Sequence, residues 1–138
     1  MAEYTFSFPI KIRISDINYG NHVSYAYYLL YFQDARIAYL NSMGFAELNI
    51  GDNKGIIVSE VDCKYKRELL LGDEIDVKCR ISSMRSKGFE MEYQIERKGE
   101  ICATAKIVIL CFDYNEKKIA NLPAIFVQKV KEFEGIWY

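Results

Sequence analysis

The feature that most constrains the fold is a change of hydrophobic period near residue 20. Apolar side chains occupy every second position from residue 4 to residue 14, which is typical of a strand with one buried face. Residues 16 to 21, Asp-Ile-Asn-Tyr-Gly-Asn, are turn formers and predict a loop. From residue 24 to residue 43 apolar residues recur every three or four positions. That spacing predicts a long amphipathic helix, with Ser24 as its cap and Gly44 as its stop.

The remainder of the chain alternates again and predicts consecutive strands. We expect strands at residues 56 to 65, 74 to 83, 89 to 97 and 101 to 112, and a final helix beginning around Pro123. The strand over 101 to 112 is the most apolar and is expected to be central. One long helix followed by antiparallel strands predicts an α+β fold of about five strands, with residues 1–138 forming a single domain.

The composition is that of a globular protein and gives no sign of nucleic-acid binding or of a membrane span. Apolar residues make up 51% of the 138 residues and charged residues 27%, as in a globular protein. A net charge of -1 gives no reason to expect nucleic-acid binding. No stretch reaches the roughly 20 apolar residues of a membrane span, and the first residues lack the layout of a signal peptide. We therefore expect a cytoplasmic protein.

The four cysteines lie singly in strand-like segments and include no Cys-x-x-Cys pair. The chain has one histidine, so no metal site is expected. Buried free thiols are the simplest reading of these cysteines.

The residues around the predicted start of the long helix carry most of the chemistry. Asp16 and His22 flank the loop that leads into the helix. A helix N-terminus offers unpaired amides and a positive dipole end, which can polarise a carbonyl. A nearby carboxylate can attack that carbonyl or activate water, a combination that suits acyl transfer. The alternative is that Asp16 is a turn carboxylate and His22 a structural residue of the loop.

The same segment resembles the opening motif of the hot-dog-fold acyl-CoA thioesterases, the 4-hydroxybenzoyl-CoA thioesterase-like family. Family members look like Asp-x-Asp-x-x-Gly-His-Val-Asn-Asn followed by a Tyr-Leu-x-x-Phe and Ala-Arg helix. The positions that fit in register are Asp16, His22, Val23, Tyr28, Leu29, Tyr31, Phe32, Ala35 and Arg36.

Three positions depart from that motif. Asn18 stands where the family has its second Asp, Gly20 lies one place before the family's Gly, and Ser24-Tyr25 replace an Asn pair. Further along, Gly72-Asp73-Glu74 resembles the start of a central family strand, and residues 85 to 89 are similar to a basic bend that contacts CoA phosphates in some members. The resemblance covers roughly residues 5 to 125 and implies a hot-dog fold.

The resemblance also implies roles for the motif residues. The carboxylate matching Asp16 serves in the family as nucleophile or as general base for water. The Val23 backbone amide resembles the donor that polarises the carbonyl. His22 is a candidate to orient Asp16, to bond the thioester carbonyl or to protonate the leaving thiolate. Asn18 is expected to bond the loop backbone or the substrate.

Further candidates for substrate binding lie outside the loop. Tyr25 is a candidate to line an acyl pocket, while most aromatic residues of the helix are expected in the core or at a subunit interface. Ser59 and Glu60 follow on the next strand, where Glu60 interrupts the alternation and faces either a wet pocket or the rim of the sheet. Arg85 and Lys87 are candidates for the CoA phosphates, and residues 64 to 67 hold a second basic cluster.

Taken together, these features predict an acyl-CoA thioesterase that releases a free acid and CoA. The only cofactor-like group is the coenzyme A of the substrate, and hot-dog proteins pair edge to edge, so we expect a homodimer or homotetramer. One alternative is a thioesterase acting on acyl carrier protein in lipid or polyketide biosynthesis. Another is a hot-dog protein that binds acyl thioesters without hydrolysing them.

Overall fold

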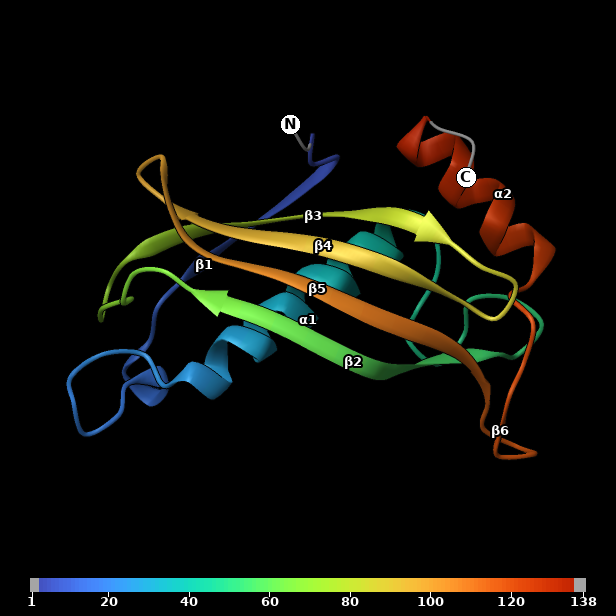
Figure 1. Ribbon diagram of the computed structural model, residues 1–138, viewed down its shortest axis with the longest axis horizontal. Coiled ribbons are helices and arrows are strands. Elements are labelled where there is room, and N and C mark those ends of the chain that lie inside the picture. Colours follow the sequence, from blue (N-terminus) through green and yellow to red (C-terminus); the bar gives the residue numbers. More distant parts are fainter. Residues whose placement is uncertain (1–2, 136–138) are drawn as a thin grey trace.

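The computed structural model describes residues 3–135, and its element order follows the predicted strand, helix and strands (Figure 1). A short 3-10 turn, Ile14–Asp16, lies between the first strand and the long helix. The elements are β1 (Phe6–Lys11), α1 (Tyr25–Ser42), β2 (Gly55–Tyr65), β3 (Glu74–Met84), β4 (Gly88–Arg97), β5 (Glu100–Asp113), β6 (Lys118–Ile119) and α2 (Ala124–Glu134).

The strands form one antiparallel sheet of six in the order β1-β3-β4-β5-β2, with β6 added beside β5. The sheet curves around α1, which crosses its inner face (Figure 1). This is the predicted α+β hot-dog arrangement. The strand expected to be central, β5, is interior, but β4 occupies the middle of the five-strand path. The two-residue β6 was not predicted, because so short a strand has no readable alternation.

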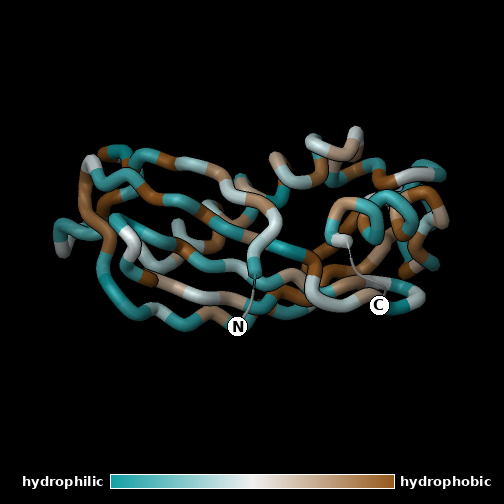
Figure 2. Tube along the Cα trace, turned by 90° about the horizontal axis from the view of Figure 1, so that it is seen from above, coloured by the Kyte–Doolittle hydropathy of each residue, from teal (hydrophilic) through white to brown (hydrophobic). Residues whose placement is uncertain are grey.

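The core lies between α1 and the inner face of the sheet. Hydrophilic and hydrophobic positions alternate along the strands, as a half-buried sheet requires (Figure 2). Aromatic residues of α1 fill the interface, and Phe32 packs on Tyr93 with ring centroids 5.0 Å apart. Arg36 is buried among them, where it donates to Glu47 at 2.7 Å and to the Tyr93 hydroxyl at 3.1 Å. Burial of this charge is tolerated because both partners satisfy it.

The middle of β2 is partly uncovered on the inner face of the sheet. Val58 and Val61 pair with the buried residues Ile109 and Ile107 of β5 and therefore share their face. Yet Val58 and Val61 are 42% and 43% exposed. The backbone of α1 lies nearest to β1 and β3, so the middle of the edge strand β2 presents an apolar strip.

No helix within residues 3–135 is both long and apolar enough to cross a membrane. The C-terminal helix α2 is fixed to the sheet through Glu134, which accepts hydrogen bonds from the Tyr39 hydroxyl, the Thr5 hydroxyl and the Ile81 amide. Three cysteines are buried and Cys63 is half-buried, all as free thiols.

Candidate active site

The loop before α1 is a compact turn that brings Asn18 and His22 together. The Asn18 amide donates to the His22 carbonyl at 2.9 Å, and the Asn21 amide donates to the Asn18 carbonyl at 3.1 Å. Gly20 lies against the His22 ring, since a Cβ on Gly20 would be 3.0 Å from His22 Nε2. A side chain at position 20 would therefore require the His22 ring to shift.

A cavity of about 320 Å³ opens where this loop, the first turn of α1 and the end of β2 meet. Its lining combines polar loop residues, three tyrosines and a charged segment that follows β2. The residues are Asn18, His22, Val23, Tyr25, Tyr28, Tyr65, Lys66, Arg67 and Glu68. A mostly apolar wall with a few convergent polar groups is the usual form of a small-molecule site.

The N-terminus of α1 lies beside this cavity. Ser24 is the N-cap residue, as predicted, but its side chain makes no capping hydrogen bond. The amides of Tyr25 and Ala26 have no hydrogen-bond acceptor among residues 3–135, as expected of the first residues of a helix. Together with the helix dipole they form a positive site beside the cavity, because Tyr25 also lines it.

The amide predicted to polarise a carbonyl, that of Val23, is not free. It donates to the Leu69 carbonyl at 2.8 Å, and Val23 is 2% exposed. Tertiary contact with the segment after β2 thus occupies the Val23 amide, the donor that the resemblance implies. The available donors lie two and three residues later, at Tyr25 and Ala26.

Asp16 lies beneath the loop and not in the cavity lining. The residue is 1% exposed. Its Oδ2 accepts hydrogen bonds from the Tyr31 hydroxyl at 2.7 Å and from the Arg13 amide at 3.3 Å. Its Oδ1 accepts one from the Ser15 hydroxyl at 3.2 Å. Burial, followed by the hydrogen bond to Asp16, raises the pKa of Tyr31, so Tyr31 remains a donor. The described geometry ties this carboxylate to the core side of α1.

The side chains of Asn18 and His22 have defined hydrogen-bond roles. Asn18 Oδ1 accepts from the Gly20 amide at 2.9 Å, which leaves the two Nδ2 hydrogens available as donors. His22 Nδ1 lies 3.2 Å from the Val23 carbonyl oxygen. A carbonyl can only accept, so Nδ1 carries the hydrogen in this contact.

Three tyrosines form one wall of the cavity. Tyr65 packs edge-on against Tyr28, with ring centroids 4.9 Å apart, and against Tyr25 at 6.4 Å. Burial raises the pKa of Tyr28 and of Tyr65 to about 12, so both hydroxyls donate at neutral pH. Tyr65 donates to the Tyr25 carbonyl and Tyr28 to the Arg67 carbonyl, each at 3.2 Å.

Ser59 and Glu60 do not reach this cavity. The register of β2 shifts between Val58 and Glu60, so Ser59 is the extra residue of a bulge. Glu60 then pairs with Val108, on the outer face of the sheet, and is exposed. Within one chain Glu60 therefore faces water, and neither Ser59 nor Glu60 lines this cavity.

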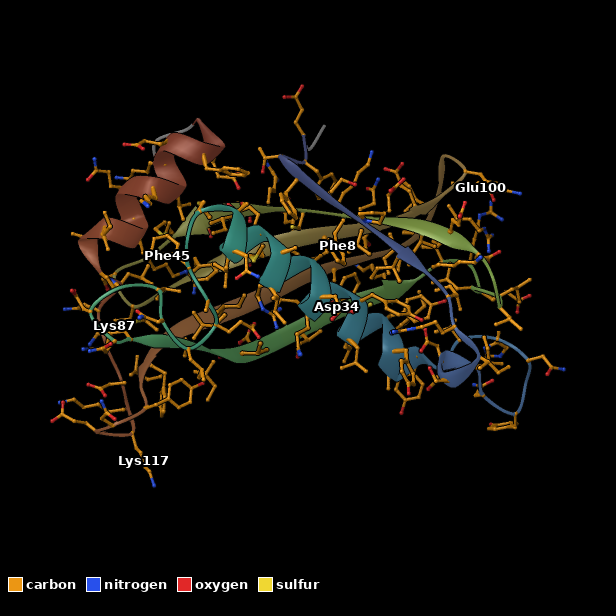
Figure 3. The ribbon with its side chains drawn as sticks, turned by 180° about the vertical axis from the view of Figure 1, so that it is seen from behind. Phe8, Asp34, Phe45, Lys87, Glu100 and Lys117 are labelled. Carbon is orange, nitrogen blue, oxygen red and sulfur yellow. The ribbon has the colours of Figure 1, made fainter. Side chains whose placement is uncertain are left out.

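Arg85 and Lys87 are also remote from the cavity within one chain. They lie in the exposed bend between β3 and β4. Lys87 is at the end of the sheet near β6 and α2, opposite the start of α1 (Figure 3). The basic residues that the structure brings to the cavity are Lys66 and Arg67, from the second basic cluster.

Sequence reasoning missed Tyr28, Tyr65 and Glu68 as lining residues. Tyr28 was assigned to the core, and it is indeed only 3% exposed, but one edge borders the cavity. The sequence offers one hint of a role for Glu68, because residues 66 to 68 form a run of three charged residues directly after a predicted strand. This run could be placed at the cavity only once the fold showed that the end of β2 lies beside the start of α1 (Figure 1).

A helix laid across a curved antiparallel sheet, with a polar cavity at the helix N-terminus, defines the class as a hot-dog thioester hydrolase. The chain belongs to the Thioesterase-like superfamily, whose family model matches residues 12–130.

Individual relatives agree with this assignment. The chain is 25% identical to the acyl-CoA thioesterase YbgC of Haemophilus influenzae over 133 residues, covering 95% of each chain. It is 22% identical to the long-chain acyl-CoA thioesterase FadM of Escherichia coli, covering 89% of this chain and 95% of FadM. A Thermus thermophilus thioesterase solved with coenzyme A and zinc has the same fold, with a TM-score of 0.85 and 23% identity over 100% of both chains.

Proposed function

We propose that this chain hydrolyses acyl-CoA thioesters to a free acid and CoA. The observation that carries the proposal is the cavity at the start of α1, which Asn18, His22 and Tyr25 line, beside the unpaired amides of Tyr25 and Ala26. Membership of the Thioesterase-like superfamily and the similarity to YbgC and FadM support acyl-CoA as the substrate. The reaction, as proposed, uses no metal or redox cofactor.

The polar groups of the cavity suit the stabilisation of a tetrahedral intermediate. A thioester carbonyl directed at the α1 N-terminus would accept hydrogen bonds from the Tyr25 and Ala26 amides and from Asn18 Nδ2. These hydrogen bonds would become stronger as negative charge develops on the carbonyl oxygen of the thioester. Water attacks the carbonyl carbon, the C–S bond breaks and CoA leaves as a thiolate. Such a thiolate is a good leaving group, so His22 need not protonate it.

Asp16 enters this proposal as a positioning residue. Its hydrogen bonds to Tyr31, Ser15 and the Arg13 amide hold the backbone that carries the loop into α1. The Asp16 carbonyl also accepts from the Ser24 amide at 3.2 Å, directly at the helix cap. To act as nucleophile or as general base, the roles expected from the motif, its carboxylate would have to break these bonds and leave the core.

Lys66 and Arg67 are proposed to bind the phosphates of CoA at the cavity mouth. Both line the cavity, and basic side chains suit phosphate oxygens. Arg85 and Lys87 contribute only if a second copy of the chain brings its β3–β4 bend towards this site. Carrier-protein thioesters remain the alternative substrate, and a carrier-protein enzyme would tolerate Lys66→Ala and Arg67→Ala.

We also propose a homodimer that covers the apolar strip of β2. An edge strand with Val58 and Val61 exposed is a template for pairing with a second copy. Pairing of the two β2 strands would extend the sheet and place the cavities near the interface; a homotetramer would require a second contact between such dimers. Light scattering at micromolar concentration should give a molar mass of at least two chains. The Val61→Glu variant should give the molar mass of one chain, because it places a charge on the strip. A monomeric wild-type chain would contradict this assembly.

A second candidate is an acyl-thioester-binding protein without hydrolysis. Two residues favour a binding protein. Asn18 carries an amide where the family motif has an Asp, and the Asp16 carboxylate is buried away from the cavity. Free-thiol release from short, long and aromatic acyl-CoAs separates the two candidates. Thiol release that depends on the protein supports the thioesterase. Calorimetric binding of an acyl-CoA with no release supports the binding protein and rejects the proposal.

A further inference from the structure

We propose that Glu68 is the general base of the reaction, accepting the proton of the attacking water. This inference rests on the proposed hydrolysis of acyl-CoA and adds a catalytic residue to it. Among the residues that line the cavity, Glu68 is the one with a carboxylate. It lies in the connection between β2 and β3, outside the motif that defines the loop.

The backbone around Glu68 is held at the cavity by three elements. The carbonyls of residues 67, 68 and 69 each accept one hydrogen bond. The Arg67 carbonyl accepts from the Tyr28 hydroxyl of α1 at 3.2 Å. The Glu68 carbonyl accepts from Arg97 Nη1 of β4 at 2.9 Å. The Leu69 carbonyl accepts from the Val23 amide of the loop at 2.8 Å. Three successive carbonyls bound to different elements fix the Cα position of Glu68.

Neighbouring anchors reinforce this placement. The Lys66 and Arg67 amides both donate to the Cys102 carbonyl, at 2.9 and 3.1 Å. The Leu69 side chain is fully buried, whereas Glu68 is exposed. An irregular segment with a buried residue on one side thus presents an exposed carboxylate on the other. The Val23 amide donates its hydrogen to this segment, at the Leu69 carbonyl, and is therefore not available as a donor to a ligand in the cavity.

The Glu68 carboxylate is free to act as a base. No ion pair to Glu68 is found within residues 3–135. The adjacent Arg67 is directed to Glu100, with Nε 3.6 Å from Oε2.

The other groups near the cavity are less suited to this role. The Asp16 carboxylate is bonded on the core side of α1. The Asn18 amide is not basic. His22 Nε2 faces Gly20 at the close approach described above. Among the described residues that line the cavity, Glu68 therefore supplies the one carboxylate, and it has no ion pair.

In the proposed step, water adds to the thioester carbonyl and Glu68 takes up one of its protons. The water oxygen bonds to the thioester carbonyl carbon while one water proton passes to Glu68. The carbonyl oxygen becomes an oxyanion held by the Tyr25 and Ala26 amides. Its collapse breaks the C–S bond and expels CoA thiolate. The proton on Glu68 then passes to the thiolate or to solvent, which regenerates the carboxylate and leaves a free acid and CoA.

The test compares Glu68→Gln with wild type in free-thiol release from acyl-CoA, with Glu116→Gln as a matched control. Glu116 is an exposed glutamate in the turn between β5 and β6. Loss of a general base lowers kcat by about 10²- to 10⁴-fold. We expect such a loss for Glu68→Gln with KM within threefold of wild type, and unchanged kcat for Glu116→Gln. Circular dichroism and urea denaturation verify that each variant is folded.

Chemical rescue provides a second readout that a structural role would not produce. Glu68→Ala opens space for formate, which should restore part of the lost kcat in proportion to its concentration. If wild type turns over and Glu68→Gln retains kcat within threefold, the assignment of Glu68 is overturned while the proposed hydrolysis stands. A large loss in Glu68→Gln without any formate rescue of Glu68→Ala would also count against a base. If wild type releases no thiol, the proposed hydrolysis fails and Glu68 as its base fails with it.

Discussion

Replacement of Tyr31 by phenylalanine tests whether Asp16 is a positioning residue. The substitution removes one oxygen and leaves the ring, which is 1% exposed, in its packing site. The lost contact is the 2.7 Å hydrogen bond from the Tyr31 hydroxyl to Asp16 Oδ2. That oxygen keeps only the longer bond from the Arg13 amide at 3.3 Å. A buried carboxylate thus loses its strongest donor.

The expected magnitude follows from the charge of the acceptor. Hydrogen bonds to charged groups contribute about 1.5–3 kcal/mol each, more than neutral ones, and an unsatisfied buried acceptor is costly. Tyr31→Phe should therefore lower the free energy of unfolding by about 1.5–3 kcal/mol. Asp16→Asn should cost a similar amount. The double variant should cost less than the sum of the two, because both single changes remove the same charged contact.

Urea denaturation at one protein concentration measures these changes, since a dimer would make stability depend on concentration. The midpoint should fall while the m-value stays constant. In parallel, kcat should decrease by a comparable factor in Tyr31→Phe and Asp16→Asn, because both loosen the loop before α1. If Asp16→Asn abolishes turnover while Tyr31→Phe leaves both stability and kcat unchanged, then Asp16 acts directly on the substrate and the positioning role is wrong.

Three further predictions concern other parts of the molecule. Gly88→Ala should lower the free energy of unfolding, measured by urea titration, by about 1–3 kcal/mol. The added Cβ would lie 2.4 Å from the Ile109 carbonyl oxygen, and a loss under about 0.5 kcal/mol would refute this prediction. Although burial alone would raise the pKa of Asp73, a backbone amide and Arg97 hold it below the usual value. The stabilisation from Asp73 is therefore present above its unfolded pKa and is lost as pH falls through the lower folded value, so Asp73→Asn should weaken the pH dependence of stability below about pH 4. Lys66→Ala should raise KM about threefold for acyl-CoA but not for an acyl-pantetheine, which lacks the nucleotide phosphates, and equal effects on both would argue against phosphate binding.

The elements that the sequence predicted well are those with a long, regular period. The helix expected over residues 24 to 43 is α1, Tyr25–Ser42, because an unbroken apolar stripe and a terminal glycine mark it. The four strands after it were predicted within about two residues at each end. Each spans ten or more residues rich in strand-forming side chains and is bounded by turn residues, so local pattern and tertiary structure agree.

The features that the sequence did not reveal depend on contacts between distant segments. The face of Glu60 is set by a bulge that shifts the register of β2, and a bulge has no fixed sequence signature. The Val23 amide was expected to be free but bonds Leu69, 46 positions away. Asp16 turns to the core because Tyr31, two helical turns into α1, offers it a buried hydroxyl.

Glu68 illustrates the same limit for the candidate site. Its place beside the loop results from hydrogen bonds to α1, β4 and the loop itself. None of these pairings can be read from the spacing of residues 66 to 69. The motif therefore indicated the correct region of the chain, and the fold determined which side chains share it.

The measurement that tests the central claim most directly removes one helix amide from the cavity. Tyr25 is the first residue of α1, where proline is tolerated, and Ser24 has the extended backbone (φ -62°, ψ 139°) that precedes proline. Tyr25→Pro deletes the amide donor, whereas Tyr25→Ala deletes the ring and keeps that donor. We predict that thiol release from acyl-CoA by Tyr25→Pro falls about 10²- to 10³-fold below that of Tyr25→Ala, the loss typical of one oxyanion donor. Equal activity of the two folded variants would contradict catalysis at the α1 N-terminus.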